Sequence, residues 1–528
     1  MASPIDSARW ARKRPPDAPL LHVPLDARDA RPLYRQLYDG LRDAILDGRL
    51  APGARLPSTR ALAADLGLAR TTVTLAFDQL RVEGYVVGSR GGGTRVRETV
   101  PDRLLDVAPA LAPRRRAAPP PPVAAGHVAR PAVRISARGA LLVEAGRGIG
   151  RGAGTTAVPF RLGVPALDAF PARTWARLTA RRWRSGDVWL GEADPGGDPA
   201  LRAAIASYVA TSRGARCTAE QVVVVSGTQS ALDLAARVLL DVGDAAWIED
   251  PGYSGAHAAL AAAGARIVPV PVDDEGIDVT EGERRAPLAR IAYVTPSHQF
   301  PLGAVLSAPR RLALLAWARR AGAWIFEDDY DSEFRYAGRP LPCLQGLEAD
   351  CSTGDARVLY VGTFNKTLVP GLRLGYLVVP DALVDAVRAA RAAVDRHPPT
   401  LAQGVLADFL GEGHYARQLR RVRALYAERQ AALVDAASRE LRGLLTIAPD
   451  CAGLHLVGWL PPGVRDVDAS RAALAHGVEA TRLSRYALTP RAPEARDALI
   501  LSYAGFDARA IARGVRRLRD ALRGLSPA

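Results

Sequence analysis

The chain has 528 residues, of which 24% are charged and 48% are hydrophobic. This composition is ordinary for globular domains and excludes a collagen, a coiled coil and a wholly disordered chain, while the length predicts two or more folded units. Four widely separated cysteines without metal-ligand spacing predict neither a metal site nor a disulfide framework. Because no uncharged apolar run reaches about 18 residues, we expect a soluble, cytoplasmic protein with no membrane span.

The charge is unevenly distributed along the chain. The formal net charge is +15, and residues 1–150 contain 24 Lys and Arg against 14 Asp and Glu, which places +10 of it there. A basic N-terminal part suggests a polyanionic partner, although basic segments also serve only to solubilise a protein. Arginine supplies almost all of the basic side chains, because Lys13 and Lys366 are the only lysines. A lysine deep in such a chain therefore requires an explanation.

Residues 31–97 are predicted to form one compact unit, which follows an N-terminal extension over residues 1–30. Apolar residues recur at helical spacing in three stretches, and Ser58 is placed to cap the second helix. The last stretch alternates apolar residues about a glycine-rich turn, which predicts a hairpin. Three helices followed by a hairpin form a winged helix-turn-helix, with elements expected over residues 33–46, 58–67, 68–84 and 85–96.

The predicted third helix is the one that enters the DNA major groove in a helix-turn-helix. Its first turn carries Arg70, Thr71 and Thr72. Arginine can bind guanine through two hydrogen bonds, and threonine hydroxyls can reach a phosphate or a thymine edge. The alternative is a protein-interaction module in which Thr71 only caps its helix. Together with a phosphate clamp on the preceding helix and on the wing, the predicted DNA contacts are Arg60, Arg70, Thr71, Thr72, Arg90 and Gly91.

The stretch LPSTRALAADLGLARTTVTLAFDQLRVEGYVVGSRGGGTRV resembles the GntR-type winged-helix repressors. It carries a leucine-proline-serine entry to a helix, an Arg-Thr-Thr recognition turn and a Glu-Gly-Tyr lead into the wing. The resemblance implies binding to double-stranded DNA. It places the same six residues at the DNA-contact positions of that family.

Residues 98–157 are predicted to be a linker. They contain PRRRAAPPPPVAAGHVARP and little periodic apolar pattern, and the proline run favours an extended, semi-rigid spacer. From residue 158 to residue 528, strand-like apolar runs alternate with helical stretches. This alternation predicts an α/β domain with a mostly parallel sheet.

Lys366 lies in GTFNKTLVPGLRLG, directly after a predicted strand. A lysine amine can form a Schiff base with an aldehyde once burial lowers its pKa, whereas arginine stays protonated and cannot. A lysine that survives by chance is the alternative. Thr363 and Arg373 lie in the same segment, where a hydroxyl and a guanidinium can bind a phosphate. These groups together are the ones that pyridoxal phosphate (PLP) requires.

A strand, a Ser-Gly-Thr-Gln turn and a helix follow one another in VVVVSGTQSALDLAARVLL. The backbone amides at such a helix N-terminus bind anions, so we expect Gly227, Thr228 and Gln229 against the phosphate. Turns of this kind are common in α/β proteins. By itself this one is weak evidence for a cofactor.

Acidic residues follow an apolar strand in AWIFEDDYDSEF, at the end where open α/β sheets bind ligands. We expect Asp328 to keep the pyridine nitrogen of PLP protonated, which makes the ring an electron sink. Tyr330 can donate to the phenolate oxygen of the ring. Tyr253, in WIEDPGYSG, can stack on the ring, or it is only a surface aromatic of a turn. Glu327 and Asp329 are expected to be structural or solvated.

Residues 158–528 resemble the fold-type I, class I aminotransferases through SGTQSALDLAARVLL, EDPGYSG, TPSHQFPLG, EDDYDSEFRY and GTFNKTLVPGLRLG, in this order. A winged helix, a linker and an aminotransferase-like domain occur in the same order in the MocR/GabR-type regulators. The resemblance implies an α/β fold with a smaller C-terminal lobe. It also implies Lys366 as the Schiff-base lysine, Asp328 as the pyridinium partner and Tyr330 as the phenolate donor. The implied stacking ring is Tyr253, and the implied phosphate ligands are Gly227, Thr228, Gln229, Thr363 and Arg373.

Three positions depart from the aminotransferase pattern, and at one of them Glu192 stands about where relatives often have an aromatic that reaches toward the phosphate of the partner subunit. Phe300 stands where aminotransferases usually have an asparagine that binds the phenolate oxygen, which leaves that contact to Tyr330, alone or with His298, and weakens the case for efficient transamination. Ile500 stands about where many of them have the arginine that binds the substrate carboxylate. Because a carboxylate favours a bidentate guanidinium, we assign this role to Arg482 or Arg485.

We therefore predict a PLP-dependent transcriptional regulator that binds a DNA operator and senses an amino compound by exchange at Lys366. Fold-type I sites generally form at dimer interfaces, so we expect a homodimer, and the resemblance implies head-to-tail exchange of the winged helices. The effector must favour one arrangement of the winged helices over another. Two alternatives remain open, an aminotransferase with an accessory DNA-binding domain and a regulator that responds to PLP itself.

Overall fold

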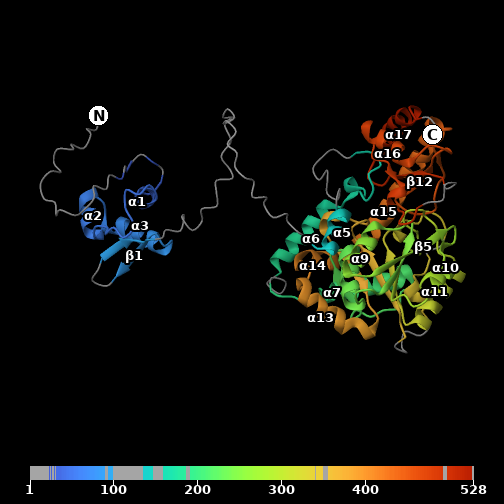
Figure 1. The fold of residues 1–528 in the computed structure, drawn as a ribbon, viewed down its shortest axis with the longest axis horizontal. Helices are drawn as coiled ribbons and strands as arrows, with labels where there is room; N and C mark the ends of the chain where they lie inside the picture. Colours follow the sequence, from blue (N-terminus) through green and yellow to red (C-terminus); the bar gives the residue numbers. More distant parts are fainter. Residues whose placement is uncertain are drawn as a thin grey trace, which may run out of the picture. The chain divides into compact units, whose positions relative to one another are not determined.

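The chain divides into two compact units, Met1–Arg130 and Pro131–Ala528 (Figure 1). Each unit contains a hydrophobic core of its own, as independent domains do. No helix in the described parts of the chain combines the length and the apolar character that a membrane span requires. The computed structural model describes residues 23, 25–26, 29, 31–89, 93–98, 135–146, 158–185, 191–338, 341–348, 355–490 and 496–525.

The first unit consists of three helices and a β-hairpin. The hydroxyl of Ser58 accepts a hydrogen bond from the amide of Ala61 at 3.1 Å and caps the second helix, which ends at Gly67 in the left-handed conformation. Leu41 and Phe77 pack in the core between the helices. The prediction of a winged helix-turn-helix is confirmed, with the elements α1 (Leu33–Leu46), α2 (Thr59–Leu66), α3 (Arg70–Val82), β1 (Val86–Ser89) and β2 (Gly93–Val96).

The first described element of the second unit is helix α5 (Ala137–Gly146), which lies inside the segment 98–157 that we predict as a linker. It packs against α9 (Ser254–Ala263). The segment ARGALLVEAG contains good helix formers, but its two glycines and its short apolar run hide the helical pattern in the sequence. Helix α5 therefore lies within the predicted linker, whose residues 99–134 and 147–157 lie outside the described residues.

An eight-stranded sheet forms the centre of the second unit, and its strands are β3 (Val222–Val225), β4 (Ala245–Asp250), β5 (Arg266–Asp273), β6 (Gly276–Ile277), β7 (Ile291–Val294), β8 (Trp324–Asp329), β9 (Val358–Thr363) and β10 (Gly375–Val378). Their order is β3-β10-β9-β8-β7-β4-β5-β6. Pairing is parallel from β9 through β8, β7 and β4 to β5, whereas β10 and β6 are antiparallel to their neighbours. The prediction of a mostly parallel sheet is confirmed.

Helices cover both faces of this sheet, which is why its strands are near-continuous apolar runs such as VVVV and IAYV. Successive side chains alternate between the faces, so Val223 and Val224 belong to different cores. In a third core, the Trp247 and Trp317 rings stack with centroids 3.8 Å apart. The helices around the sheet, besides α9, are α6 (Ala172–Arg184), α7 (Pro199–Arg213), α8 (Thr228–Leu239), α10 (Val279–Arg285), α11 (Ala308–Ala321), α12 (Leu344–Leu347), α13 (Val384–Asp395) and α14 (Thr400–Gly411).

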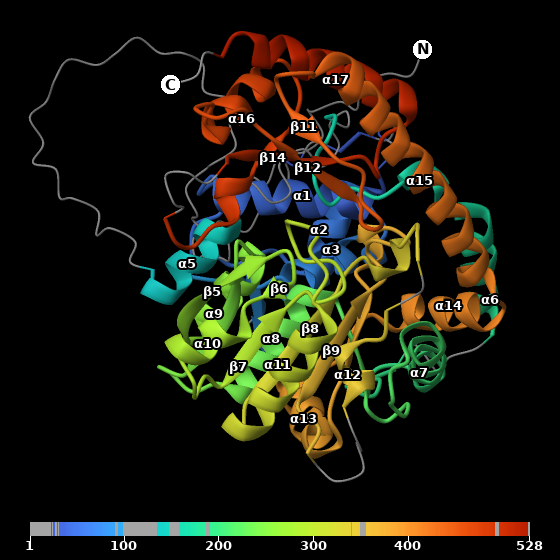
Figure 2. The same ribbon diagram turned by 90° about the vertical axis from the view of Figure 1, so that its right-hand side faces the viewer.

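A second, smaller sheet forms the C-terminal lobe, as the sequence resemblance implies. Its antiparallel strands have the order β11-β12-β14-β13, with bounds β11 (Thr446–Ile447), β12 (His455–Trp459), β13 (Thr481–Arg482) and β14 (Ala498–Ser502). Figure 2 shows this lobe above the large sheet, with α16 (Asp466–Ala475) and α17 (Ala508–Arg523) at the top and the long helix α15 (His414–Glu440) along one side. Amphipathic α17 buries Ile511, Val515 and Leu518, which recur at helical spacing.

Candidate functional site

A cavity of about 460 Å³ lies at the carboxyl ends of the strands of the large sheet. Its wall includes Thr295 directly after β7, Asp328 in β8 and Thr363 at the end of β9. This edge is where open α/β sheets bind ligands, and the volume suits a small molecule. The residues that we predict for cofactor or effector binding and that line this cavity are Thr228, Gln229, Tyr253, Asp328, Tyr330, Thr363, Lys366, Arg373 and Arg485.

Lys366 follows β9 and is the only lysine among the described residues. Its Nζ donates a hydrogen bond to the carbonyl oxygen of Gly163 at 3.4 Å. Burial lowers the pKa of Lys366, although Asp331 and Asp328 act in the opposite direction. A lowered pKa leaves more of the amine neutral, and the neutral amine is the form that attacks a carbonyl carbon.

Asp328 is buried near the end of β8, where its hydrogen-bond partners are uncharged hydroxyls. Its Oδ2 accepts a hydrogen bond from Tyr293 Oη at 2.6 Å, and its Oδ1 accepts one from Thr228 Oγ1 at 3.4 Å. Burial raises the pKa of Asp328 to about 7. A cationic ring nitrogen would therefore fit here, because it would offset the desolvation of the carboxylate. We did not predict Tyr293, whose only signal is a hydroxyl near the end of the buried run RIAYVTP.

The two acidic neighbours of Asp328 have partners elsewhere, in agreement with a structural role. Glu327 accepts hydrogen bonds from two backbone amides at the start of α12, at 2.8 and 3.1 Å. Asp329 forms a buried ion pair of 2.7 Å with Arg213. Because successive side chains of a strand alternate between its two faces, only Asp328 of the three lines the cavity.

A cradle for an anion lies between the N-terminus of α8 and the loop after β9. Gly227 has a φ of 120°, which favours glycine, and a Cβ at this position would lie 2.8 Å from Asn365 Nδ2. The Asn365 Oδ1 atom is buried and has no hydrogen-bond partner among the described residues. Arg373 lines the same cavity in the left-handed conformation, with a φ of 50°. Helix amides, the hydroxyls of Thr228 and Thr363 and this guanidinium are a donor set that fits a phosphate.

Tyr253 and Gln229 are held together at the ends of two helices. The Tyr253 hydroxyl donates to Gln229 Oε1 at 3.3 Å, and the Gln229 amide donates to the carbonyl oxygen of Gly255 at 3.1 Å. The Gln229 side chain is therefore used to connect α8 with α9. The Tyr253 ring lines the cavity and meets the Phe300 ring edge-on, with centroids 6.2 Å apart.

The Tyr330 hydroxyl lies beside a buried histidine. The Nδ1 atom of His298 is 3.2 Å from Tyr330 Oη and 2.9 Å from Asp331 Oδ2, and its Nε2 is 3.4 Å from Asp450 Oδ2. Only an imidazolium can donate to both carboxylates. Although burial opposes it, the two carboxylates raise the pKa of His298 to about 10. The Phe300 ring meets Tyr330 edge-on at 6.0 Å and offers no hydrogen bond in place of the missing asparagine.

The charge on His298 leads to an expected pH dependence of stability. Its pKa is about 10 in the folded protein, against an ordinary value of 6.5. The stability that this proton contributes is fully present below about pH 6.5 and is lost as the pH rises through about 10. Between about pH 7 and about pH 9, the unfolding free energy of the wild type should fall because His298 loses its proton. In His298→Gln this fall should be smaller by up to about 2 kcal/mol.

Urea titrations at the two pH values measure this difference. The exposed His476→Gln is the matched control and should behave like the wild type. If the stability of the His298→Gln variant falls with pH as steeply as that of the wild type, His298 is not charged in the folded protein.

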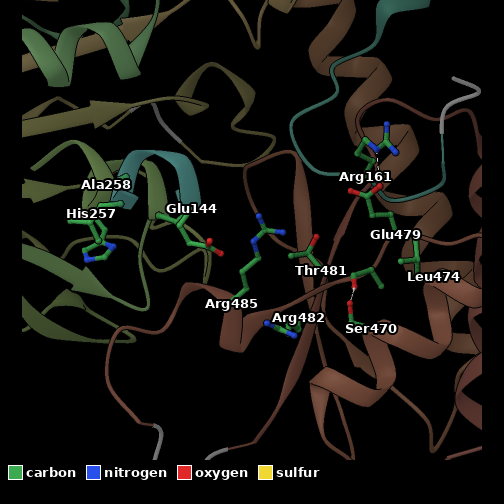
Figure 3. Close-up of a pocket in the computed structure, with 13 residues that line it drawn as sticks. Glu144, Arg161, His257, Ala258, Ser470, Leu474, Glu479, Thr481, Arg482 and Arg485 are labelled. Atoms are coloured by element: carbon green, nitrogen blue, oxygen red, sulfur yellow. Dashed lines mark hydrogen bonds and ion pairs between the residues drawn. The ribbon is translucent and has the colours of Figure 1, made fainter. Parts of the chain in front are cut away.

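The two arginines that we predict for a carboxylate differ in position. Arg485, in the short helix η7 (Leu483–Tyr486), lines both the cavity and an adjacent hollow of about 850 Å³ between α5, α9 and the C-terminal lobe, which we call the distal hollow (Figure 3). Arg482 lines only the distal hollow. Ile500 in β14 is fully buried, so an apolar side chain occupies the position where many aminotransferases have an arginine.

The predicted DNA contacts that the structure describes lie on α2 and α3. Helix α3 begins at Arg70, and the preceding Ala69 provides no side-chain cap. Thr71 therefore lies inside the first turn and does not cap the helix, contrary to the capping role that the protein-interaction alternative gives it. The exposed members of the set are Arg60, Arg70 and Thr71, and the half-buried one is Thr72. Arg90 and Gly91 lie outside the described residues.

Two family models match the chain, one for each unit. The model described as "Bacterial regulatory proteins, gntR family" matches residues 33–96, and the model described as "Aminotransferase class I and II" matches residues 162–518. Among solved structures, the α-aminoadipate aminotransferase LysN of Thermus thermophilus, in complex with N-(5'-phosphopyridoxyl)-L-leucine, superposes with a TM-score of 0.63 and 32% identity. The match covers 72% of this chain and 98% of LysN.

Two curated relatives match over nearly their whole length. The probable rhizopine catabolism regulatory protein MocR of Rhizobium meliloti is 42% identical over 504 residues, which is 94% of this chain and 95% of the relative. The transcriptional regulator TauR of Rhodobacter capsulatus is 35% identical over 513 residues, which is 93% of this chain and 96% of the relative. The two domains, the PLP-type cavity and these relatives together show that the chain belongs to the MocR-type family of PLP-dependent, GntR-type transcriptional regulators.

Proposed function

We propose that the protein binds an operator through α2 and α3 and senses an amino compound, an amino acid or a related amine, in the cavity of its second unit. The single observation that carries this proposal is the convergence of Lys366, Asp328 and the anion cradle on one cavity. When bound, PLP supplies an aldehyde that condenses with amines and a ring that withdraws electrons. We assign DNA binding to residues 31–97 and effector binding to residues 158–528, with an extension over 1–30 and a linker over 98–157 outside α5.

Each polar group of the cavity has a separate task in this proposal. Lys366 would hold PLP through its neutral amine, and the amine of an effector would compete with that amine. Asp328 holds a proton at the ring nitrogen, because a buried carboxylate is stabilised by an adjacent cation. Tyr330 would donate to the phenolate oxygen, and Tyr253 would provide a ring for the cofactor to stack on. The phosphate would be held by Gly227, Thr228, Thr363 and Arg373, and by the backbone of Gln229.

We further propose that the protein is a head-to-tail homodimer and that an arginine binds the carboxylate of the effector. Arg485 is the better placed candidate for a carboxylate in the cavity, because it lines the cavity wall and Arg482 does not. Sedimentation of the full chain tests the dimer. A monomer at micromolar concentration would contradict it.

Arg70 provides a direct test of the DNA-binding surface. An arginine in the first turn of a recognition helix that binds guanine through two hydrogen bonds contributes about 1–3 kcal/mol. We expect Arg70→Ala to weaken operator binding by about 10- to 100-fold at constant salt. The measurement is fluorescence anisotropy with a genomic fragment that the wild-type protein selects. Arg49→Ala removes the same charge from another exposed site of the first unit and should change the affinity less than about threefold.

A genuine aminotransferase is the second candidate, favoured by the likeness to LysN. It uses the same cavity, so the cavity residues do not separate the two functions. Two measurements separate them, the steady-state conversion of a keto acid and DNA footprinting on the selected fragment. Rapid turnover without a specific footprint supports the enzyme, whereas a footprint that changes when an amine is added, with slow or absent turnover, supports the regulator.

A further inference from the structure

The distal hollow is larger than the cofactor cavity and continuous with its wall. Its volume is about 850 Å³, against about 460 Å³ for the cavity. Ser254, at the start of α9, and Arg485 line both spaces. Figure 3 shows the Arg485 side chain reaching from the C-terminal lobe into the space between Glu144 and Thr481. A molecule whose amine is in the cofactor cavity can therefore extend past Arg485 into the distal hollow.

The charges around the distal hollow favour an anion at its C-terminal side. Arg161 is paired with Glu479 at 2.7 Å, so these two charges offset each other. Arg482 and Arg485 are exposed and form no ion pair of 4.0 Å or less with a carboxylate in the described part of the chain. Burial lowers the pKa of His257, which keeps that ring neutral. Two guanidinium groups, from the consecutive elements β13 and η7, therefore line the C-terminal side of the hollow, whereas the carboxylate of Glu144 lines the α5 side.

The remaining wall suits a chain of methylene groups. Leu141 of α5, Ala258 of α9 and Leu474 of α16 line the distal hollow, and the hydroxyls of Ser470 and Thr481 lie at its edge. An apolar wall with a few convergent polar groups is the usual composition of a small-molecule site. The arginine side of the hollow determines which group such a ligand carries. Guanidinium groups bind carboxylates and similar oxyanions through paired hydrogen bonds.

We propose that the distal hollow is a second ligand subsite, which binds the anionic far end of an effector whose amino group is held at the cofactor. This inference rests on the proposed function. It specifies the effector as an amine that carries a carboxylate or a similar oxyanion several bonds away. Arg482 binds that oxyanion, and Arg485 lies where the ligand passes from the cofactor cavity into the hollow.

The subsite also provides a route from the effector to the linker. Leu141 and Glu144 of α5 line the distal hollow, and α5 packs against α9. Helix α5 lies on the N-terminal side of the second unit, where the chain arrives from the winged helix-turn-helix. A ligand in the hollow therefore contacts the part of the effector domain that is nearest in sequence to the DNA-binding unit.

The experiment uses the full-length, PLP-loaded protein and pairs of amino acids that differ only in the charge of the far end. The probes are L-glutamate, L-2-aminoadipate and L-2-aminopimelate, each with its side-chain amide, and the readout is the change in cofactor absorbance. We expect at least one acid to reach half-saturation at about tenfold lower concentration than its amide. Arg482→Gln should reduce this ratio to less than about threefold, whereas Arg465→Gln, exposed and outside the hollow, should preserve it.

Hydrogen exchange of residues 137–146 provides a second readout. The preferred acid should slow the exchange of α5 in the wild type and not in Arg482→Gln. Equal half-saturation for acid and amide at every chain length overturns the inference, and so does a preference that survives in Arg482→Gln or an α5 whose exchange does not respond. If no amine changes the cofactor absorbance, the proposed function itself fails and the subsite fails with it.

Discussion

Replacement of Lys366 by alanine is expected to leave a colourless protein that still binds its operator. The wild type should fix one PLP per chain on borohydride reduction and the variant none, because Lys366 is the only described amine of the cavity wall. Operator binding should survive because α3 belongs to the other unit, which has its own core. Absorbance, mass spectrometry of the reduced protein and anisotropy with the selected fragment measure the two properties separately.

Lys366→Arg is the matched control for charge. It retains a cation of similar length but cannot condense with an aldehyde, since guanidinium stays protonated. We expect it to be as colourless as Lys366→Ala and to give no response to amines. A reducible PLP adduct mapped to another residue in either variant would show that Lys366 does not hold the cofactor.

Replacement of Asp328 by asparagine is expected to weaken PLP binding by a factor on the order of 100 to several thousand, which corresponds to about 3–5 kcal/mol for a buried charge pair that loses one partner. The amide keeps the shape of the side chain, and its neighbours Tyr293 and Thr228 are hydroxyls that can still form hydrogen bonds with it. The unfolding free energy of the cofactor-free protein should therefore change little. Titration with PLP followed by absorbance gives the affinity.

Asp329→Asn, one residue further along β8, should do the opposite. Asp329 forms the direct ion pair of buried Arg213, so its loss breaks that pair and is expected to reduce the unfolding free energy by about 3–5 kcal/mol. The fraction that remains folded should bind PLP with wild-type affinity. Equal effects of both substitutions on PLP affinity would indicate that Asp328 has no special contact with the ring.

The parts of the fold that could be predicted depend on local patterns. The strands of the large sheet are apolar runs with both faces buried, and α2 of the first unit has its cap, Ser58, and its stop residue, Gly67, in the sequence. Helix α5 lacks such signals, because glycines flank a short apolar run, and its position against α9 depends on a tertiary contact. The sequence pattern therefore could not predict this helix within the predicted linker.

The same division applies to the site. Lys366 and Asp328 could be proposed because each residue type is unusual at its place, a lysine in an arginine-rich chain and a carboxylate at the end of an apolar strand. The contact between His298 and Asp450 joins the large sheet's loops to the C-terminal lobe across 152 positions, and no local pattern indicates it. Likewise, the difference between Arg482 and Arg485 depends on which wall each side chain reaches.

Strand β8 carries three consecutive carboxylates, and each of them has different surroundings. Glu327 is anchored to α12, Asp328 faces the cofactor cavity and Asp329 neutralises Arg213. Because side chains alternate along a strand, the insertion or deletion of one residue upstream in β8 would turn every one of these groups toward the wrong partner. Such a change would abolish cofactor binding and lower stability together, because Trp324, Ile325 and Phe326 at the start of the strand would also exchange the two cores that they fill.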